Sequence, residues 1–233
     1  MLSLKGNLFC FEGPHMANFR IIYVSWPKAQ AREMNPEAEQ FKEGMSLKAK
    51  KTRGEWKIAY FGEGRALSGL PANSQIYVLG HSNIGKESIS NGHENLGYIE
   101  VSDRLIFSGL SRHYGGRLKF YNCLNALDAT MARGENSFAA KAASYLRGKE
   151  FRSVRIFGYS AMLTTPVAGL PKGYIPAGSN QMKLGARAVR VEYDAQGSPF
   201  MVQPIISVMR DTTPALSAME EYSSFYSDDE GED

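Results

Sequence analysis

Short apolar runs typical of buried strands recur along the chain and alternate with segments that carry helix signals. The runs are rich in β-branched and aromatic residues and several are bounded by Gly or Asn, as strands inside a sheet are; they cover residues 19–26, 56–61, 76–79, 118–121 and 154–159. Strands that alternate with helices form mostly parallel sheets covered by helices. The pattern predicts an α/β fold, a three-layer sandwich around a largely parallel central sheet.

Three helices are predicted between these runs from capping residues and from Gly or basic stop signals. They are expected at residues 35–51, 102–114 and 136–148. The second is expected to start at Ser102-Asp103, and the third at Asn136-Ser137. Beyond a Gly- and Pro-rich loop, residues 186–209 alternate like an antiparallel hairpin around a D-A-Q-G turn. The chain therefore continues from the parallel sheet into a C-terminal hairpin.

Composition divides the chain into one domain and two appendages. Residues 1–17 are interpreted as an N-terminal extension, residues 18–210 as the α/β domain, and residues 211–233 as an acidic, disordered tail that contains no Lys or Arg. No apolar run approaches the length of a membrane span, and the start lacks the apolar core of a signal peptide. We expect a soluble protein, cytoplasmic or exported without a classical signal, whose oligomeric state the sequence leaves open.

The two cysteines, Cys10 and Cys123, lie far apart and neither belongs to a C-x-x-C pair. Neither has a His or Cys neighbour at the spacing of metal ligands. We therefore expect no disulfide framework and no metal site.

The stretch Q-I-Y-V-L-G-H-S-N-I-G-K-E-S, residues 75–88, admits three interpretations. The first is a phosphate-binding loop, Gly-x-x-x-x-Gly-Lys, at residues 80–86. Its chemistry needs a Ser or Thr directly after the Lys to hold magnesium, and Glu87 stands there instead. A carboxylate at that place would repel phosphate, so this nucleotide-binding interpretation ranks low.

The second interpretation is a serine nucleophile elbow that starts at Gly80-His81-Ser82. The tight turn of an elbow needs Gly two positions after the Ser, where Ile84 stands. That fold also takes its base from a His late in the chain, whereas all four histidines here precede residue 114. The pattern argues against a serine hydrolase.

The third interpretation makes His81 the functional residue, placed by strand 76–79 at the carboxyl edge of the sheet. Sites in open α/β sheets assemble at that edge. The next predicted strand, residues 118–121, delivers Cys123 to the same edge. An isolated Cys or His is usually a packing residue, but two at consecutive strand ends favour a thiol–imidazole pair.

These pieces, I-Y-V-L-G-H-S and L-K-F-Y-N-C-L-N-A, resemble the motifs of the caspase-like cysteine peptidases of clan CD. In that family an apolar strand ends in His-Gly, and about forty residues later another strand leads to the catalytic Cys. The following helix and the strand V-R-I-F-G-Y-S look most like the self-processing protease domain of bacterial RTX and large clostridial toxins. The resemblance covers about residues 56–165, and Ser82 replaces the family's Gly.

The resemblance implies a cysteine peptidase that cleaves a protein or peptide substrate. Cys123 would attack the carbonyl, His81 would move the proton, and the N–H groups of Cys123 and Ser82 would bind the oxyanion. Relatives seat the substrate side chain between the loop after the Cys and the next strand, which gives the pocket candidates Asp128, Tyr159 and Ser160. Glu63 is a candidate for orienting His81.

No metal or cofactor is implied, but inositol hexakisphosphate activates the toxin relatives by binding a basic surface. The matching basic candidates here are Lys48, Lys50, Lys51, Arg53, Arg187 and Arg190. They would equally serve as solvated surface residues. No nucleic-acid partner and no membrane span are expected.

The rival hypothesis is a catalytically inactive caspase-like binding or adhesion module. The Ser in place of Gly at position 82 favours this hypothesis, because Ser82 is strained if the family's Gly has positive φ at this position. The retained His81 and Cys123 favour the peptidase.

Overall fold

A computed structural model describes residues 18–48, 54–82, 86–123, 125–126, 136–163, 173–175, 183–184, 188–193 and 197–201. The chain divides into two units, Met1–Val202 and Gln203–Asp233, and every described residue belongs to the first. The extension at residues 1–17 and the acidic tail at 211–233 therefore lie outside the described residues.

The element order confirms alternating strands and helices. The helices are the 3-10 turn η1 (Lys28–Gln30), α1 (Met34–Lys48), α2 (Tyr98–Phe107) and α3 (Phe138–Gly148). The strands are β1 (Asn18–Val24), β2 (Gly54–Tyr60), β3 (Gln75–Leu79), β4 (Ser88–Ser90), β5 (Asn95–Gly97), β6 (Arg117–Tyr121), β7 (Arg155–Gly158), β8 (Met162–Leu163), β9 (Gly173–Ile175), β10 (Lys183–Leu184), β11 (Val189–Tyr193) and β12 (Pro199–Met201). All five predicted strand runs are strands of one sheet.

That sheet, within the described part of the chain, has the strand order β12-β11-β7-β6-β3-β1-β2. Five adjacent strands of this order, β7, β6, β3, β1 and β2, run parallel. Strand β11 pairs antiparallel with β12, as the predicted C-terminal hairpin requires, and it also pairs antiparallel with β7. From β1 the chain moves to β2 on one side and then to β3 on the other, so the strand order reverses between β1 and β3. Open α/β sheets bind ligands beside such a switch point.

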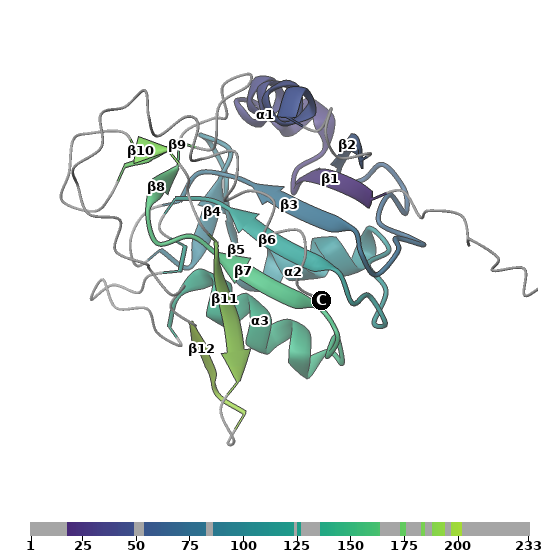
Figure 1. The fold of residues 1–233 in the computed structure, drawn as a ribbon, viewed down its shortest axis with the longest axis vertical. Coiled ribbons are helices and arrows are strands. Elements are labelled where there is room, and N and C mark those ends of the chain that lie inside the picture. The colour runs from purple at the N-terminus through teal and green to yellow at the C-terminus, as the bar shows by residue number, and fades with distance from the viewer. Residues whose placement is uncertain are drawn as a thin grey trace, which may run out of the picture. The chain divides into compact units, whose positions relative to one another are not determined.

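Helices cover both faces of this sheet (Figure 1). On one face the Phe41 ring of α1 contacts the rings of Trp56, Tyr77 and Tyr121 at centroid distances of 4.7–5.8 Å. On the other face Phe138 of α3 packs edge-on against Phe120. Because successive residues of a strand point to opposite faces, Phe120 and Tyr121 serve different layers. The fold is therefore α/β with a mostly parallel sheet between two helical layers.

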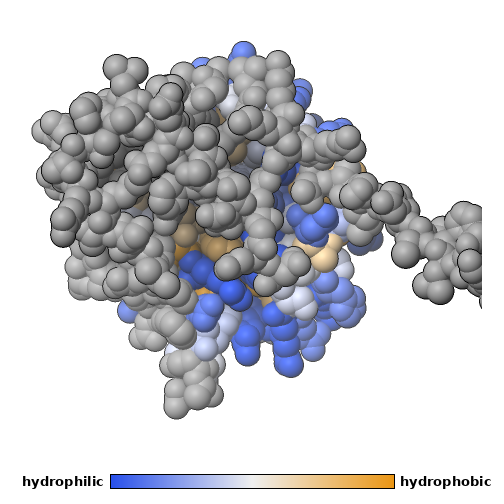
Figure 2. Space-filling view, in the orientation of Figure 1, coloured by the Kyte–Doolittle hydropathy of each residue, from blue (hydrophilic) through white to orange (hydrophobic). Residues whose placement is uncertain are grey.

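The described residues also form two smaller sheets beside the central one. Strands β4 and β5 form a short antiparallel hairpin between β3 and α2. Strands β8, β9 and β10 form a second antiparallel sheet after β7. In the view of Figure 1 the described surface around α3 is mostly hydrophilic (Figure 2). Within the described residues, no helix combines the length and apolarity needed to cross a bilayer.

The predicted start of the second helix is wrong. Helix α2 begins at Tyr98, and Ser102 lies buried within it rather than at its cap. The Glu100 carboxylate accepts a hydrogen bond from the Gly97 N–H at 2.8 Å, which satisfies one free donor at the true start. The helix ends at Phe107, seven residues before the predicted end at residue 114. The start of α3 is confirmed, with Ser137 Oγ accepting from the Ala140 N–H.

Candidate active site

His81 follows the buried strand β3 and Gly80. Its backbone N–H donates to the Ser90 carbonyl and its carbonyl accepts from the Ser90 N–H, both at 2.8 Å. Two hydrogen bonds to β4 therefore fix the His81 backbone. A side chain at Gly80 would be crowded, since a Cβ there would lie 3.0 Å from the Ile89 Cβ and 3.1 Å from the Asn122 amide nitrogen. The glycine therefore permits β3, β4 and the end of β6 to meet at one point.

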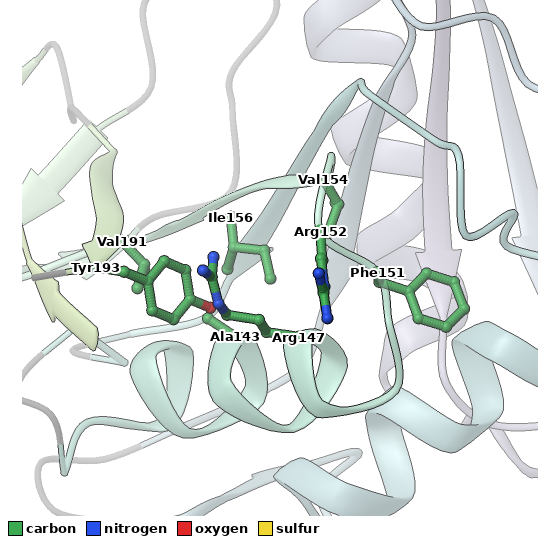
Figure 3. Close-up of a pocket in the computed structure, with 8 residues that line it drawn as sticks. All are labelled: Ala143, Arg147, Phe151, Arg152, Val154, Ile156, Val191 and Tyr193. Atoms are coloured by element: carbon green, nitrogen blue, oxygen red, sulfur yellow. The ribbon is translucent and has the colours of Figure 1, made fainter. Parts of the chain in front are cut away.

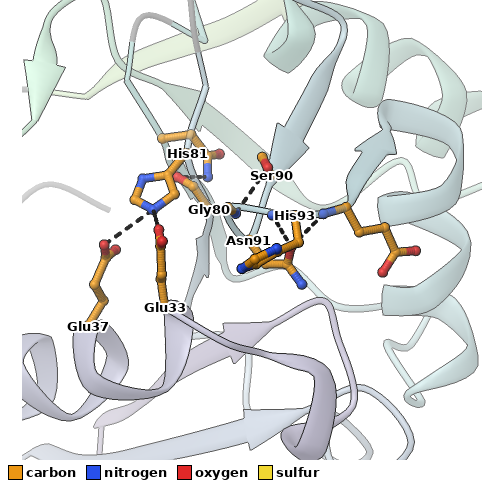
Figure 4. Close-up of polar contacts among 10 residues, drawn as sticks. Glu33, Glu37, Gly80, His81, Ser90, Asn91 and His93 are labelled. Atoms are coloured by element: carbon orange, nitrogen blue, oxygen red, sulfur yellow. Dashed lines mark hydrogen bonds and ion pairs between the residues drawn. The ribbon is translucent and has the colours of Figure 1, made fainter.

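The His81 ring faces two carboxylates from the start of α1 (Figure 4). Its Nε2 lies 3.2 Å from Glu33 Oε2 and 3.3 Å from Glu37 Oε1. Residues four apart meet on one side of a helix, and the Glu37 N–H donates to the Glu33 carbonyl in that pattern. Glu63, the candidate suggested for this role, instead accepts a hydrogen bond from the Tyr60 N–H at 3.1 Å.

Cys123 follows strand β6, two residues beyond its end. Its Sγ accepts a hydrogen bond from the Leu163 N–H at 3.3 Å and lies 3.7 Å from the Leu163 carbonyl oxygen. Burial raises the pKa of the thiol above its ordinary value; the Glu37 charge adds to the rise, and the Leu163 N–H opposes it. The resting side chain is therefore a neutral thiol near neutral pH.

His81 and Cys123 line the same pocket. Leu79 of β3 is paired in register with Tyr121 of β6, and His81 and Cys123 each stand two positions further along. A step of two residues keeps a side chain on the same face of a sheet, here the face that α1 covers. The pocket has a volume of about 90 Å³ and is lined by Glu37, Phe41, Leu79, Gly80, His81, Tyr121, Cys123 and Leu163.

Two buried asparagines fix the backbone on either side of Cys123. Asn122 donates from its amide to the Gly80 carbonyl at 3.0 Å, which ties the end of β6 to the end of β3. Asn125 donates to the carbonyls of Phe120 and Asn122, both at 2.6 Å, and accepts from the Tyr159 N–H at 2.9 Å. The Cys-bearing turn is therefore anchored to both neighbouring strands.

Ser82, which replaces the Gly of the resembled family, shows no backbone strain. Positive φ among the described non-Gly residues occurs only at Arg32 and Glu150. The Ser82 Oγ donates to the Ser88 carbonyl at 3.4 Å. A side chain at position 82 is thus compatible with the backbone path that the chain adopts there.

The pocket candidates are placed differently from one another. Tyr159 is 1% exposed and packs edge-on against Tyr121, so its side chain belongs to the core rather than to an open pocket. Ser160 is half-buried directly after it, and Asp128 lies outside the described residues. A buried ring next to the site gives support to Tyr121, which lines the pocket.

The predicted polyanion surface falls mostly outside the described part of the chain. Arg190 pairs with Glu192 at 3.4 Å. The backbone of Lys48 ends α1, while Lys50, Lys51, Arg53 and Arg187 are not among the described residues.

The segment after Ser82 also bears on the phosphate-loop interpretation. That chemistry directs phosphate to the N-terminus of a helix that follows the loop. Here the chain continues into strand β4, and Glu87 pairs with Lys141 of α3. The described structure thus lacks a helix N-terminus where such a loop would need one.

A second, smaller cavity lies between α3 and β11 (Figure 3). Its volume is about 10 Å³, roughly that of one water position. Arg147 stacks on the Tyr193 ring with its Cζ 4.2 Å from the ring centroid. The arrangement is a packing contact, since a space of this size holds no substrate.

Comparison with protein-family models found no match for this chain, and comparison with curated proteins found none either.

The sequence predicted that His81 and Cys123 lie at one sheet edge, and both line one pocket; it did not point to Glu33, Glu37, Asn122 or Asn125, which contact them or the adjacent backbone. The carboxylates precede His81 by more than forty residues, and no local pattern links them to it. The Asn-Cys-Leu-Asn spacing was a usable signal, because a small amide side chain beside a strand end commonly bonds the backbone nearby.

Proposed function

We propose that the chain is a caspase-like cysteine peptidase in which Cys123 is the nucleophile and His81 the general base. The observation that carries the proposal is the shared pocket of these two side chains. It lies at the carboxyl ends of two adjacent parallel strands, beside the point where the strand order reverses. Topology and side-chain chemistry thus favour the same edge of the sheet.

The raised pKa of Cys123 favours general-base catalysis over a preformed thiolate. As the Cys123 Sγ forms a bond to the peptide carbonyl carbon, its proton passes to His81. His81 then gives that proton to the leaving amine as the C–N bond breaks. Water hydrolyses the thioester, with His81 again accepting a proton and the Cys123 thiol restored at the end.

Backbone N–H groups would stabilise the negative oxygen of each tetrahedral intermediate. The candidates are the N–H of Cys123 and the N–H of Ser82, from the turns after β6 and β3. Donors fixed by the protein are effective in this role because they need no rearrangement as charge develops. The backbone bonds of His81 to Ser90 and the Asn122 bond to Gly80 supply that fixity.

The second candidate function is a non-catalytic binding module. Two observations favour it: the Leu163 N–H donates a hydrogen bond to the Cys123 Sγ, and the pKa of the thiol is raised. In this case His81 and Cys123 would serve packing and hydrogen bonding alone.

Incubation with an unbiased peptide library, read by mass spectrometry, separates the two. The peptidase proposal expects cleavage that is abolished by Cys123→Ala and reduced about 10²-fold or more by His81→Ala. Cys10→Ser is the matched control and should cleave like the wild type. Cleavage that survives Cys123→Ala contradicts the mechanism, and a library left intact by the wild type favours the binding module.

A further inference from the structure

The His81 ring is held at one nitrogen by two carboxylates. Nε2 contacts Glu33 Oε2 at 3.2 Å and Glu37 Oε1 at 3.3 Å, while the ring is 43% exposed. We propose that Glu33 and Glu37 are positioning residues that fix the His81 ring through Nε2, so that Nδ1 is the nitrogen that accepts the Cys123 proton. The assignment of Nδ1 as base rests on the peptidase function proposed above.

The chemistry of imidazole determines which nitrogen is basic. A neutral ring carries one N–H and one lone pair, on different nitrogens. Ionised carboxylates can only accept hydrogen bonds, so when Glu33 and Glu37 are ionised the ring nitrogen that faces them carries the proton. The lone pair then resides on Nδ1, which is the only ring atom left to take a proton from the thiol.

The Glu33 carboxylate is confined by the loop after β4. Gly92 has φ of 92°, and a Cβ built on it would lie 2.8 Å from the Glu33 carboxyl carbon. The Gly92 N–H donates to Ser90 Oγ at 3.1 Å, and Ser90 is the residue whose backbone pairs with His81. One loop therefore places the His81 backbone and borders the carboxylate that contacts its ring.

Glu37 faces both members of the pair. It lines the pocket with His81 and Cys123, and its charge acts on the thiol as well as on the ring. When His81 takes the Cys123 proton the ring becomes positive, and an adjacent carboxylate stabilises that charge. Glu33 and Glu37 would thus fix the orientation of the ring and favour the charged state through which it passes.

The test reads the protonated nitrogen of His81 by ¹⁵N NMR of the neutral ring, with its signals assigned by comparison with His81→Ala. We expect an Nε2–H ring in the wild type and a mixture of the two tautomers in Glu33→Ala/Glu37→Ala. Peptide cleavage by that double variant should show kcat lowered about 10²-fold, the low end of a general base's contribution, with KM within about twofold. Glu43→Ala, at an exposed glutamate of α1, is the matched control and should change neither the His81 tautomer nor peptide cleavage.

Glu33→Gln/Glu37→Gln keeps the shape of both side chains and serves if the alanine variant unfolds. It should also shift the tautomer, because an amide can donate to Nε2 as well as accept from it. An Nδ1–H ring in the wild type, or an unchanged tautomer in both double variants, would overturn the proposal. A tautomer shift in a protein without Cys123-dependent cleavage would refute the peptidase function while supporting the role of Glu33 and Glu37 in fixing the ring.

Discussion

At the scale of single residues, Asn125 anchors the turn that carries Cys123. Its side chain bonds the Phe120 and Asn122 carbonyls and the Tyr159 N–H, all in buried surroundings. Each buried group left without a partner costs about 1–3 kcal/mol. We expect Asn125→Ala to lower the free energy of unfolding by about 3 kcal/mol in urea titrations.

Asn95→Ala is the control, since Asn95 is exposed on β5 and should change stability by less than about 0.5 kcal/mol. Equal effects of the two substitutions would show that the Asn125 bonds contribute nothing specific.

The thiol of Cys123 gives a prediction on pH. Because burial raises its pKa, the thiolate that reacts with iodoacetamide should form only above the range of an exposed cysteine, about pH 8.5. Labelling of Cys123 in a Cys10→Ser background should therefore rise through alkaline pH, as followed by mass spectrometry. A rate that has already reached its plateau at neutral pH would contradict a neutral resting thiol.

The common pocket of His81 and Cys123 could be predicted from the sequence because parallel strands end at a common edge. The carboxylates of Glu33 and Glu37 could not, since their place beside His81 depends on how α1 crosses the sheet. That crossing is set by contacts of Phe41 with rings from three strands, far apart in the sequence. Local sequence patterns therefore do not predict the contact of Glu33 and Glu37 with His81.

At the scale of elements, capping chemistry explains which helix starts could be predicted. Ser137 caps α3 with its own side chain, and the sequence shows that directly. Helix α2 starts after Gly97, which has no side chain to mark the cap, and Ser102-Asp103 gave a false signal inside the helix. The β4–β5 hairpin escaped prediction because strands of three residues are too short to show alternation.

The loop between β4 and β5 offers a test of how His81 is held. In Gly92→Ala the new methyl group would meet the Glu33 carboxylate, and φ of 92° is strained for alanine. We expect Glu33 to leave His81 and the protein to lose about 1–2 kcal/mol of stability. The His81 tautomer measured by NMR should then approach that of Glu33→Ala.

Gly197→Ala is the matched control, because Gly197 also has positive φ but a Cβ added there would meet no atom within 4 Å. It should cost stability without changing the His81 ring. A normal His81 signal in Gly92→Ala would show that the loop does not position Glu33.

At the scale of the whole molecule, the order of the strands places the candidate site next to a switch point. Strands β2 and β3 lie on opposite sides of β1, so the strand order reverses between β1 and β3, one strand away from the pair β3 and β6 whose carboxyl ends carry His81 and Cys123. The sequence predicted a largely parallel sheet from its alternating elements. It did not predict the strand order, which depends on packing between segments that are distant along the chain.

Buried tyrosines predict how the stability of the molecule depends on alkaline pH. Burial raises the pKa of Tyr23 and Tyr114 to about 12, against about 10 in an unfolded chain. Because the folded state holds these protons more tightly, the stabilisation is complete below pH 10 and is lost as the pH rises toward 12. Urea midpoints should therefore fall over that interval.

Tyr114→Phe should reduce the slope of the free energy of unfolding against pH in this interval by about 1.4 kcal/mol per pH unit. It also loses the hydrogen bond to the Ser74 carbonyl, which lowers stability at every pH. A variant with the same slope as the wild type would show that Tyr114 ionises without regard to folding.

The most direct measurement of the central claim is covalent labelling of Cys123 by a library of peptidyl acyloxymethyl ketones, which react with a cysteine that is assisted by a base in a peptide-binding cleft. The account predicts that wild-type Cys123 is labelled and that His81→Ala is labelled at least about 10²-fold more slowly. Equal labelling of the two proteins, or no labelling of a wild-type Cys123 that iodoacetamide can reach, would contradict it.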